Sequence, residues 1–221
     1  MQIGFILFPN VTQLDFTGPL QVLHRMPGAT TSIIAKTADP VPSDCGLGLM
    51  PTHTFDTAPK LDFICVPGGF GVVDALGDTE TMDFVRQMGE GADYVTSVCT
   101  GALILGGAGL LKGKKATTHW AYTDLLSVFG ATYTKGRVVR DGNTFTGGGV
   151  TAGIDFAYTI IADLVDQKTA EALQLGLEYN PQPPTGTGHP DVAPEKLTAA
   201  MRKHYVEQVA NTRAALEALT A

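Results

Sequence analysis

The sequence predicts an α/β fold, in which helices cover both faces of a mostly parallel central sheet. Short, continuous apolar runs bounded by Gly, Pro and polar residues alternate with longer segments in which apolar residues recur every three to four positions. Strands buried on both faces have such continuous runs, and the longer segments have the period of amphipathic helices. Alternation of the two is typical of a parallel sheet with crossover helices.

These elements can be placed in chain order. Strands are expected at residues 2–8, 30–35, 61–66 and 94–98, each an apolar run between turn-forming residues. Helices are expected at residues 14–26, 79–89, 101–111, 122–129, 150–165 and 168–177. A hairpin is expected at residues 138–145, because Asp141-Gly142 supplies the positive φ that a tight reversal needs.

The last part of the chain departs from this alternation. Residues 179–194 are rich in proline, which excludes helix and central strand, so we expect an extended arm. Residues 195–221 then form one amphipathic helix, whose pattern fits packing against its own domain or against a second subunit. With 44% hydrophobic and 17% charged residues, the chain of 221 residues suffices for one core, so we treat 1–221 as a single domain.

Charge and composition narrow the range of partners. The formal net charge is −7 at pH 7 and no basic run exceeds Lys114-Lys115, which argues against nucleic acid and anionic membranes. The N-terminus has no cationic leader, and no stretch approaches the roughly 18 apolar residues of a membrane span. The histidines lack metal-ligand spacing. We therefore expect a cytoplasmic protein that acts on a small molecule and holds no metal.

Cys99 is the strongest candidate for chemistry. It follows the strand expected at 94–98, with the small residues Ser97 and Gly101 two positions away on either side. Small neighbours allow the strained strand-to-helix turn called a nucleophile elbow, which lifts a side chain toward substrate. The helix start should lower the pKa of the thiol, and its amides can form part of an oxyanion hole. The alternative is a small buried hydrophobe.

The sequence around the other two cysteines gives less indication of a function. Three cysteines argue against a disulfide framework, so each thiol is judged by its surroundings. Cys65 lies within an expected buried strand and should be inert. Cys45 is expected in a loop with no base evident near it, and the sequence assigns it no role.

Three further segments could meet Cys99, because loops after parallel strands gather at one edge of the sheet. An amide at Gly69 or Phe70, in a glycine-rich turn after the strand at 61–66, could face a developing anion; a turn without a ligand fits as well. Asp15 could exchange a proton with the thiol, which would raise its pKa, or could serve only as a helix cap. His119 could orient Cys99, line the pocket or be structural.

These residues carry a resemblance to a known family. An acidic residue after the first strand, a Pro-Gly-Gly turn and a cysteine on a nucleophile elbow stand at Asp15, Pro67-Gly68-Gly69 and Cys99, as in the DJ-1/PfpI superfamily. The likeness covers residues 1 to about 180. It implies a flavodoxin-like fold, a homodimer and no cofactor. Within the superfamily the chain is most similar to the isocyanide hydratases, which share Asp at the acidic position, Thr100 and the stretch Leu-Gly-Leu-Glu-Tyr-Asn-Pro-Gln-Pro-Pro at 175–184.

The resemblance implies a reaction. The Cys99 thiolate attacks the terminal carbon of an isocyanide, Asp15 supplies a proton, and water releases an N-substituted formamide. Thr100 and Gly69 would stabilise the developing charge. An apolar substituent would bind among several side chains and the turn at 148–150. The expected pocket residues are Phe16, Phe70, Trp120, His119, Gly148 and Val150.

Two rival functions come from the same superfamily. Peptidases of this superfamily have His directly after the cysteine, where Thr100 stands, and its glyoxalases and deglycases have Glu, where Asp15 stands. Ligand-sensing domains of transcriptional regulators share the Thr-Thr-His-Trp stretch at 117–120. A glyoxalase or deglycase, and a ligand or redox sensor in which Cys99 is oxidised, therefore remain the alternatives to a hydratase.

Overall fold

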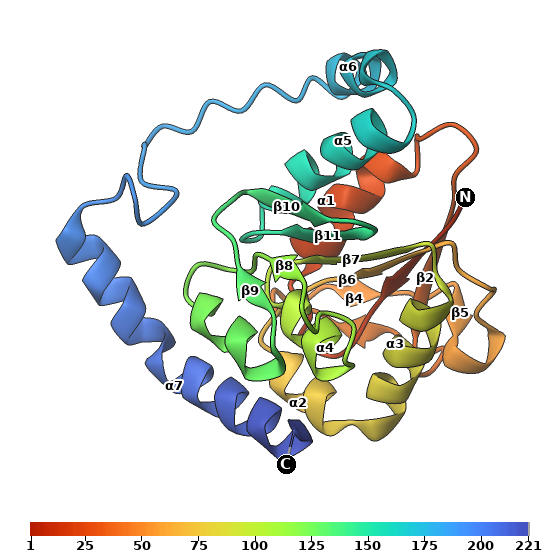
Figure 1. Ribbon diagram of the computed structural model, residues 1–221. Coiled ribbons are helices and arrows are strands. Elements are labelled where there is room, and N and C mark those ends of the chain that lie inside the picture. The colour runs from red at the N-terminus through yellow and green to blue at the C-terminus, as the bar shows by residue number, and fades with distance from the viewer. Residues whose placement is uncertain (221) are drawn as a thin grey trace.

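The computed structural model describes residues 1–220, and Figure 1 shows a central sheet between two layers of helices. The order of the seven strands is β10-β11-β7-β6-β1-β2-β5, and every neighbouring pair is parallel except β10 and β11. In that order the strands are β10 (Val138–Asp141), β11 (Thr144–Gly147), β7 (Tyr94–Val98), β6 (Phe63–Val66), β1 (Gln2–Ile6), β2 (Thr30–Ala35) and β5 (His53–Thr54). The predicted fold class is confirmed.

The apolar strands are explained by helices on both faces. In β1, Ile3 and Phe5 belong to one hydrophobic cluster and Ile6 to the other, because successive side chains point to opposite faces. The first cluster is covered by α1 (Gln13–Leu23), α5 (Ala152–Leu164) and α6 (Gln167–Gly176). The second is covered by α2 (Val72–Gly77), α3 (Thr79–Gly91), α4 (Gly101–Gly107), the 3-10 helix η2 (Thr123–Phe129) and α7 (Glu195–Thr220).

Several elements differ from the predicted ones. The segment predicted as a helix at 122–129 is the 3-10 helix η2, a geometry common in short connectors. The helix predicted to reach Leu111 ends at Gly107, because Gly109 takes a positive φ of 84° soon after. The short helix α2 was missed. So were the 3-10 turn η1 (Phe55–Thr57) and the two-stranded pairs of β3 (Val41–Pro42) with β4 (Gly48–Leu49) and β8 (Lys115–Ala116) with β9 (Thr132–Tyr133).

The hairpin near the edge of the sheet follows the predicted chemistry. Strands β10 and β11 are antiparallel, with Asp141 opposite Thr144. Gly142 takes a φ of 63° in the turn between them. The end of β11 is thereby brought beside β7, the strand that leads to Cys99.

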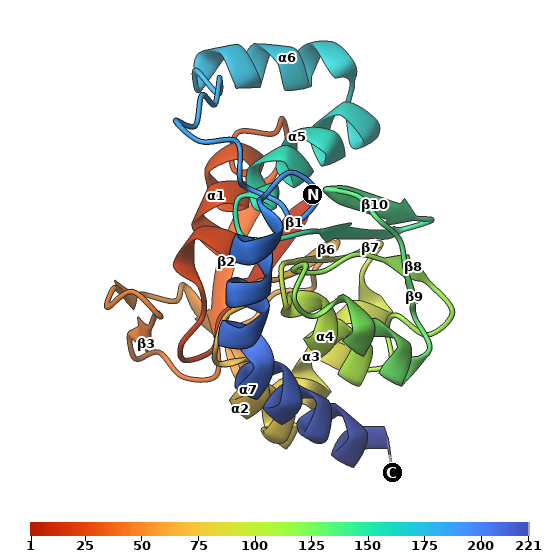
Figure 2. The same ribbon diagram turned by 90° about the vertical axis from the view of Figure 1, so that its left-hand side faces the viewer.

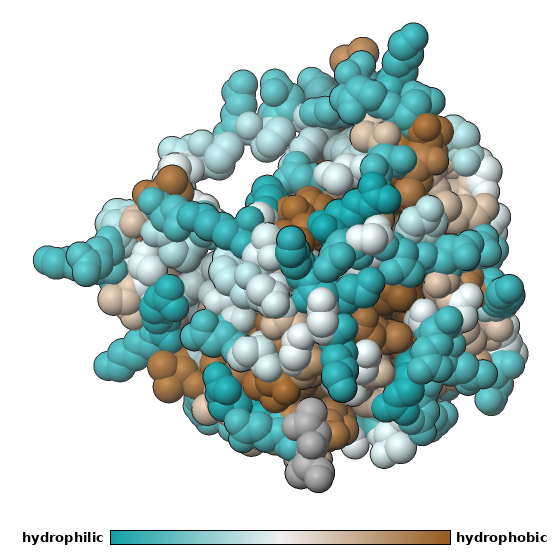
Figure 3. Space-filling model, viewed as in Figure 1, coloured by the Kyte–Doolittle hydropathy of each residue, from teal (hydrophilic) through white to brown (hydrophobic). Residues whose placement is uncertain are grey.

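The C-terminal segment returns to its own domain. Residues 180–189 are exposed and form neither helix nor strand, and Figure 3 shows this mostly hydrophilic stretch arching away from the body. Figure 2 shows α7 lying along the side of the molecule, with its lower half beside α2. Leu216 is fully buried there, whereas Leu197 and Met201 near the start of α7 are exposed. None of the helices in residues 1–220 combines the length and apolarity needed to cross a membrane.

Candidate active site

Cys99 has the backbone of a nucleophile elbow. It joins β7 to α4 with a φ of 56°, a left-handed conformation that non-glycine residues rarely adopt. Its amide donates to the carbonyl oxygens of Gly147 (3.1 Å) and Gly148 (2.8 Å) at the end of β11. Its carbonyl oxygen accepts from Thr118 Oγ1 at 2.8 Å. The strained turn is therefore held from both sides by neighbouring segments.

Gly101 is required by a close backbone approach. A Cβ atom at this position would collide with the carbonyl oxygen of Val66 and would lie 2.7 Å from that of Pro67. The carboxyl end of β6 and the start of α4 can approach each other only because no side chain stands between them. This approach brings the Pro67-Gly68-Gly69 turn next to Cys99 and Thr100.

Asp15 lies in the first turn of α1 and its side chain is fully buried. The Gly68 amide donates to its Oδ2 atom at 2.8 Å, whereas Oδ1 has no donor of good geometry among residues 1–220. Burial raises the pKa of Asp15 from 3.8 to about 7, outweighing the hydrogen bonds from Gly68 and Cys99, which lower it. A carboxyl group of this pKa can give and take a proton near neutral pH.

The thiol of Cys99 behaves differently from the sequence-based expectation. Burial raises its pKa well above 9.0 and the nearby Asp15 raises it further, whereas hydrogen bonds from the amide and hydroxyl of Thr100 lower it. The expectation that the helix start would depress this pKa was therefore wrong, because loss of hydration dominates. A thiol whose pKa is raised depends on a nearby base to become a nucleophile, and Asp15 is the carboxyl group beside it.

Thr100 links the glycine turn to the sulfur. Its Oγ1 atom accepts from the Gly69 amide at 3.0 Å, so that amide is occupied and orients the hydroxyl. The expected role of Gly69 as a second, free oxyanion donor is thus not supported by this geometry. Gly69 has a φ of 141°, and a Cβ atom there would lie 2.5 Å from the Thr12 amide, which explains why glycine occupies this position.

Two cavities border the residues around Cys99. One, of about 240 Å³, is lined by Gly69, Phe70, Thr100, Tyr122 and residues of α7. The other, of about 470 Å³, is lined by His119, Trp120, Gly148 and Val150, among others. All but one of the residues expected to form a pocket therefore line these cavities. The exception is Phe16, which packs edge-to-face on Phe5 in the core.

His119 lines the site with an uncharged side chain. Burial lowers its pKa from 6.5 to about 4, so the imidazole is neutral near pH 7. Its Nδ1 atom accepts from the Ala121 amide at 3.3 Å. Its ring contacts those of Trp120, Tyr122 and Tyr205, with centroids 5.2 to 5.8 Å apart. Of the roles considered from the sequence, lining the pocket fits this position.

Two tyrosines at the site were missed by the sequence analysis. Burial is the main cause of the raised pKa values of Tyr122 and Tyr205, and the charge that Cys99 carries when it is ionised contributes less. Tyr205 lies in the segment 195–221, which was expected as one amphipathic helix, and such a pattern carries no sign of what the helix packs against. No local motif marks either residue, because only the fold brings the two rings together.

The remaining cysteines lie elsewhere. Cys65 is fully buried in β6, and burial raises its pKa to about 12, which fits the inert role predicted for it. Cys45 is exposed, and its sulfur lies 3.5 Å from Ser43 Oγ. Within residues 1–220, His, Cys, Asp and Glu side chains form no group of three or more that could hold a metal ion.

Comparisons with known proteins show which family this chain resembles. The sequence model of the DJ-1/PfpI family matches residues 1–163. An isonitrile hydratase from Pseudomonas putida is 56% identical over 203 residues, which is 92% of this chain and 89% of that protein. The crystal structure of a THiJ/PfpI family protein from Pseudomonas syringae is 45% identical, with a TM-score of 0.94 over 97% of this chain and 90% of that one.

The likeness extends to a regulator. The HTH-type transcriptional regulator CdhR of Pseudomonas aeruginosa is 26% identical over 208 residues, covering 90% of this chain and 59% of that protein. The sequence model of the DJ-1/PfpI family matches residues 1–163, a range that contains the Asp15 segment, the glycine turn and the elbow. The chain belongs to the DJ-1/PfpI family.

Proposed function

We propose that this protein is a cofactor-independent isocyanide hydratase that converts an isocyanide and water to an N-substituted formamide. The 56% identity with an isonitrile hydratase over most of both chains supports the reaction. In the site itself, one observation carries the proposal: a buried carboxyl group with a pKa of about 7 faces a thiol on a nucleophile elbow. This pair can supply both the nucleophile and the proton that a hydration needs.

The first half of the reaction makes a covalent adduct. Asp15 accepts the thiol proton as the sulfur attacks the terminal carbon of R–N≡C, forming a carbon–sulfur bond. The same proton then passes from Asp15 to that carbon, which gives the thioimidate R–N=CH–S–Cys99. Hydrogen bonds from the amide and hydroxyl of Thr100 stabilise the sulfur while it carries negative charge.

The second half consumes water. Asp15, again a carboxylate, takes a proton from a water molecule as the oxygen of that water attacks the thioimidate carbon, and Asp15 then passes this proton to the nitrogen. As the carbon–sulfur bond breaks, Asp15 transfers the proton of the new hydroxyl group to the departing sulfur, which releases R–NH–CHO and returns Cys99 and Asp15 to their starting protonation. Because one isocyanide and one water enter and one formamide leaves, no oxidant, reductant or cofactor is required.

The charge state of the pocket favours this class of substrate. His119 is neutral, and the rings of Trp120 and Tyr122 lie beside it. Phe70, with 56% of its surface exposed, adds an apolar side chain at the mouth of the smaller cavity. Isocyanides are uncharged molecules with an apolar substituent, so such walls suit them.

The test is turnover of a small isocyanide with the purified protein. We expect formamide to form with the wild type and a mass increase equal to one substrate on Cys99 to be trapped during turnover. Cys99→Ala should abolish both, and Cys65→Ala is the matched control, because that thiol is buried in β6. A Cys99→Ala variant that keeps even a few per cent of the rate would remove Cys99 from the mechanism. Consumption of methylglyoxal without isocyanide turnover would favour a glyoxalase.

We also propose that the protein is a cytoplasmic homodimer, as the family resemblance implies. The exposed apolar side chains of Leu175 and Val192, at 83% and 65% of their surfaces, are available to a second copy. Light scattering after size exclusion measures the state directly. A mass equal to one chain at micromolar concentration would contradict the dimer.

A further inference from the structure

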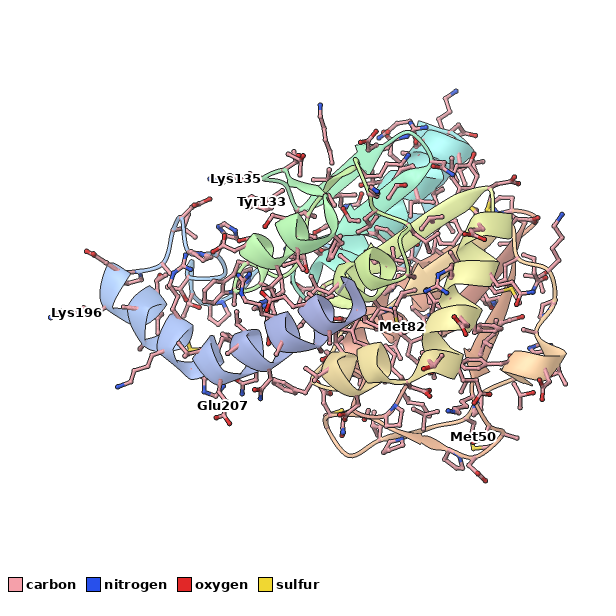
Figure 4. The ribbon with its side chains drawn as sticks, turned by 60° about the horizontal axis from the view of Figure 1, so that its bottom comes forward. Met50, Met82, Tyr133, Lys135, Lys196 and Glu207 are labelled. Atoms are coloured by element: carbon pink, nitrogen blue, oxygen red, sulfur yellow. The ribbon has the colours of Figure 1, made fainter. Side chains whose placement is uncertain are left out.

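The C-terminal helix reaches the cavity that contains Thr100. Gln208, Asn211 and Thr212 of α7 line this cavity of about 240 Å³ together with Gly69 and Thr100. Figure 4 shows Glu207 on the opposite side of α7, pointing away from the body. One face of α7 is therefore turned toward the active site and the other toward solvent.

Tyr205 stands on the inward face, one helical turn before Gln208. Its ring meets those of His119, Trp120 and Tyr122, with centroids 5.2, 5.7 and 6.0 Å apart and planes inclined at 60°, 90° and 66°. Edge-to-face packing of this kind fixes the ring in place. Tyr205 therefore closes a group of aromatic walls that belong to segments far apart in the sequence.

The place of Tyr205 in the site is shown by its neighbours. Its ring packs on the ring of Tyr122, which lines the cavity of about 240 Å³ together with Thr100 and Gly69. No hydrogen bond to the Tyr205 hydroxyl is formed by residues 1–220, so its contacts within this part of the chain are those of the ring. Tyr205 therefore belongs to the aromatic side chains on the α7 side of that cavity.

We propose that Tyr205 is a specificity-determining residue, and that α7 forms the wall of the site that binds the carbon substituent of the isocyanide. The inference rests on the proposed function, and it adds the part of the substrate that this helix recognises. The chemistry of the wall favours bulky, uncharged, apolar substituents over a methyl group. The thiol, the carboxyl group and Thr100 act on the –N≡C end, which every isocyanide shares.

The test compares two probes, cyclohexyl isocyanide and methyl isocyanide, with wild-type protein and Tyr205→Ala. We expect the KM for cyclohexyl isocyanide to rise about tenfold, the scale of losing one good apolar contact, while kcat stays within about twofold. The KM for methyl isocyanide should not change. Tyr205→Phe, which keeps the ring, should behave as wild type, and Val206→Ala on the exposed face is the matched control.

A second measurement does not depend on isocyanide turnover. If α7 covers the approach to Cys99, Tyr205→Ala should raise the rate of Cys99 alkylation by iodoacetamide several-fold, whereas Val206→Ala should not. If the wild type does not hydrate isocyanides but Tyr205→Ala still raises the alkylation rate of Cys99, the proposed function is wrong and the inferred position of α7 is supported. Unchanged alkylation and unchanged KM in a folded Tyr205→Ala protein would overturn the inference.

Discussion

The turn around Cys99 and the aromatic wall carried by α7 are two halves of one site, and they are built in opposite ways. In the turn, the reactive groups are held by hydrogen bonds that involve the backbone: the Gly68 amide donates to Asp15, the Gly69 amide to Thr100 and the Cys99 amide to the Gly148 carbonyl oxygen. In the wall, Tyr205 is held by ring contacts with three side chains from outside α7. Its helix follows an exposed arm that has no regular structure.

The two regions suit different tasks: the turn suits the reaction itself, and the wall suits the choice of substrate. Reactive atoms must be placed to within fractions of an ångström, and a strained turn between sheet strands supplies that rigidity. A wall for an apolar substituent needs only volume and an uncharged surface, so side chains on a peripheral helix suffice. Changes in the turn should therefore abolish or slow the reaction on every substrate, whereas changes in the wall should alter preference.

The largest effect expected in the turn is that of Asp15→Asn. Loss of the proton carrier should reduce kcat by about 100- to 10,000-fold, the usual scale for a general acid–base. The wild-type kcat/KM should rise with pH through about 7, because below that pH Asp15 holds its proton and cannot deprotonate Cys99. Asp15→Asn should lack this limb of the pH profile.

The stability of the wild type should depend on pH in the opposite direction to its activity. The pKa of Asp15 is about 7 in the fold against 3.8 normally, so the folded state binds the proton more tightly and the wild type loses stability as pH rises from about 4 to about 7. Asp15→Asn removes this slope. Urea unfolding at pH 4.5 and pH 8 measures it, and an equal loss of activity and stability at both would make Asp15 structural.

Gly101→Ala tests how closely the carboxyl end of β6 and the start of α4 approach each other. The added Cβ atom meets the backbone carbonyls of Val66 and Pro67, which cannot move as a side chain would. We expect the free energy of unfolding to fall by about 3 kcal/mol, the upper part of the range for overpacking. Gly91→Ala is a fair control, since nothing lies within 4 Å of its added atom. Equal stability of the two variants would show that the approach is not tight.

Thr100→Val removes one hydroxyl from the sulfur's environment. Loss of a hydrogen bond to a charged group costs about 1.5–3 kcal/mol, so kcat/KM should fall at least about tenfold for bulky and small isocyanides alike. Thr100→Ser, which keeps the hydroxyl, should retain most of the rate. If kcat/KM falls for only one size of isocyanide, the turn also contributes to substrate preference, and the division of roles between turn and wall is wrong.

The smallest effect is expected at the start of the arm. Tyr179 donates to Asp155 Oδ1 at 2.9 Å, and Arg137 pairs with Oδ2 of the same carboxylate. These groups are partly exposed, so Asp155→Asn should cost less than about 1 kcal/mol and leave kcat unchanged. Because the Arg137 carbonyl accepts from the Gly148 amide at 2.9 Å, a clear fall in kcat would instead extend the rigid turn to this cluster.

The sequence by itself determined the sheet, the elbow and its glycines. Runs of β-branched, aromatic and small residues identify strands such as Thr30–Ala35 and Tyr94–Val98 with their full bounds, because such residues fit strands that are covered on both faces. The small residues around Cys99 and the glycine turn are local requirements of backbone geometry, so they are visible in the sequence. The resemblance to isocyanide hydratases, carried by the same residues, is confirmed by the relative from Pseudomonas putida.

Only the tertiary structure decided how these parts act together. Whether burial or the helix start sets the pKa of Cys99 depends on everything packed around it, and burial prevails. Gly69 binds Thr100 rather than facing an empty oxyanion site, and Phe16 turns into the core. Tyr205 joins the rings of His119, Trp120 and Tyr122 because α7 packs on α2, α4 and η2, a long-range arrangement that no periodic pattern encodes.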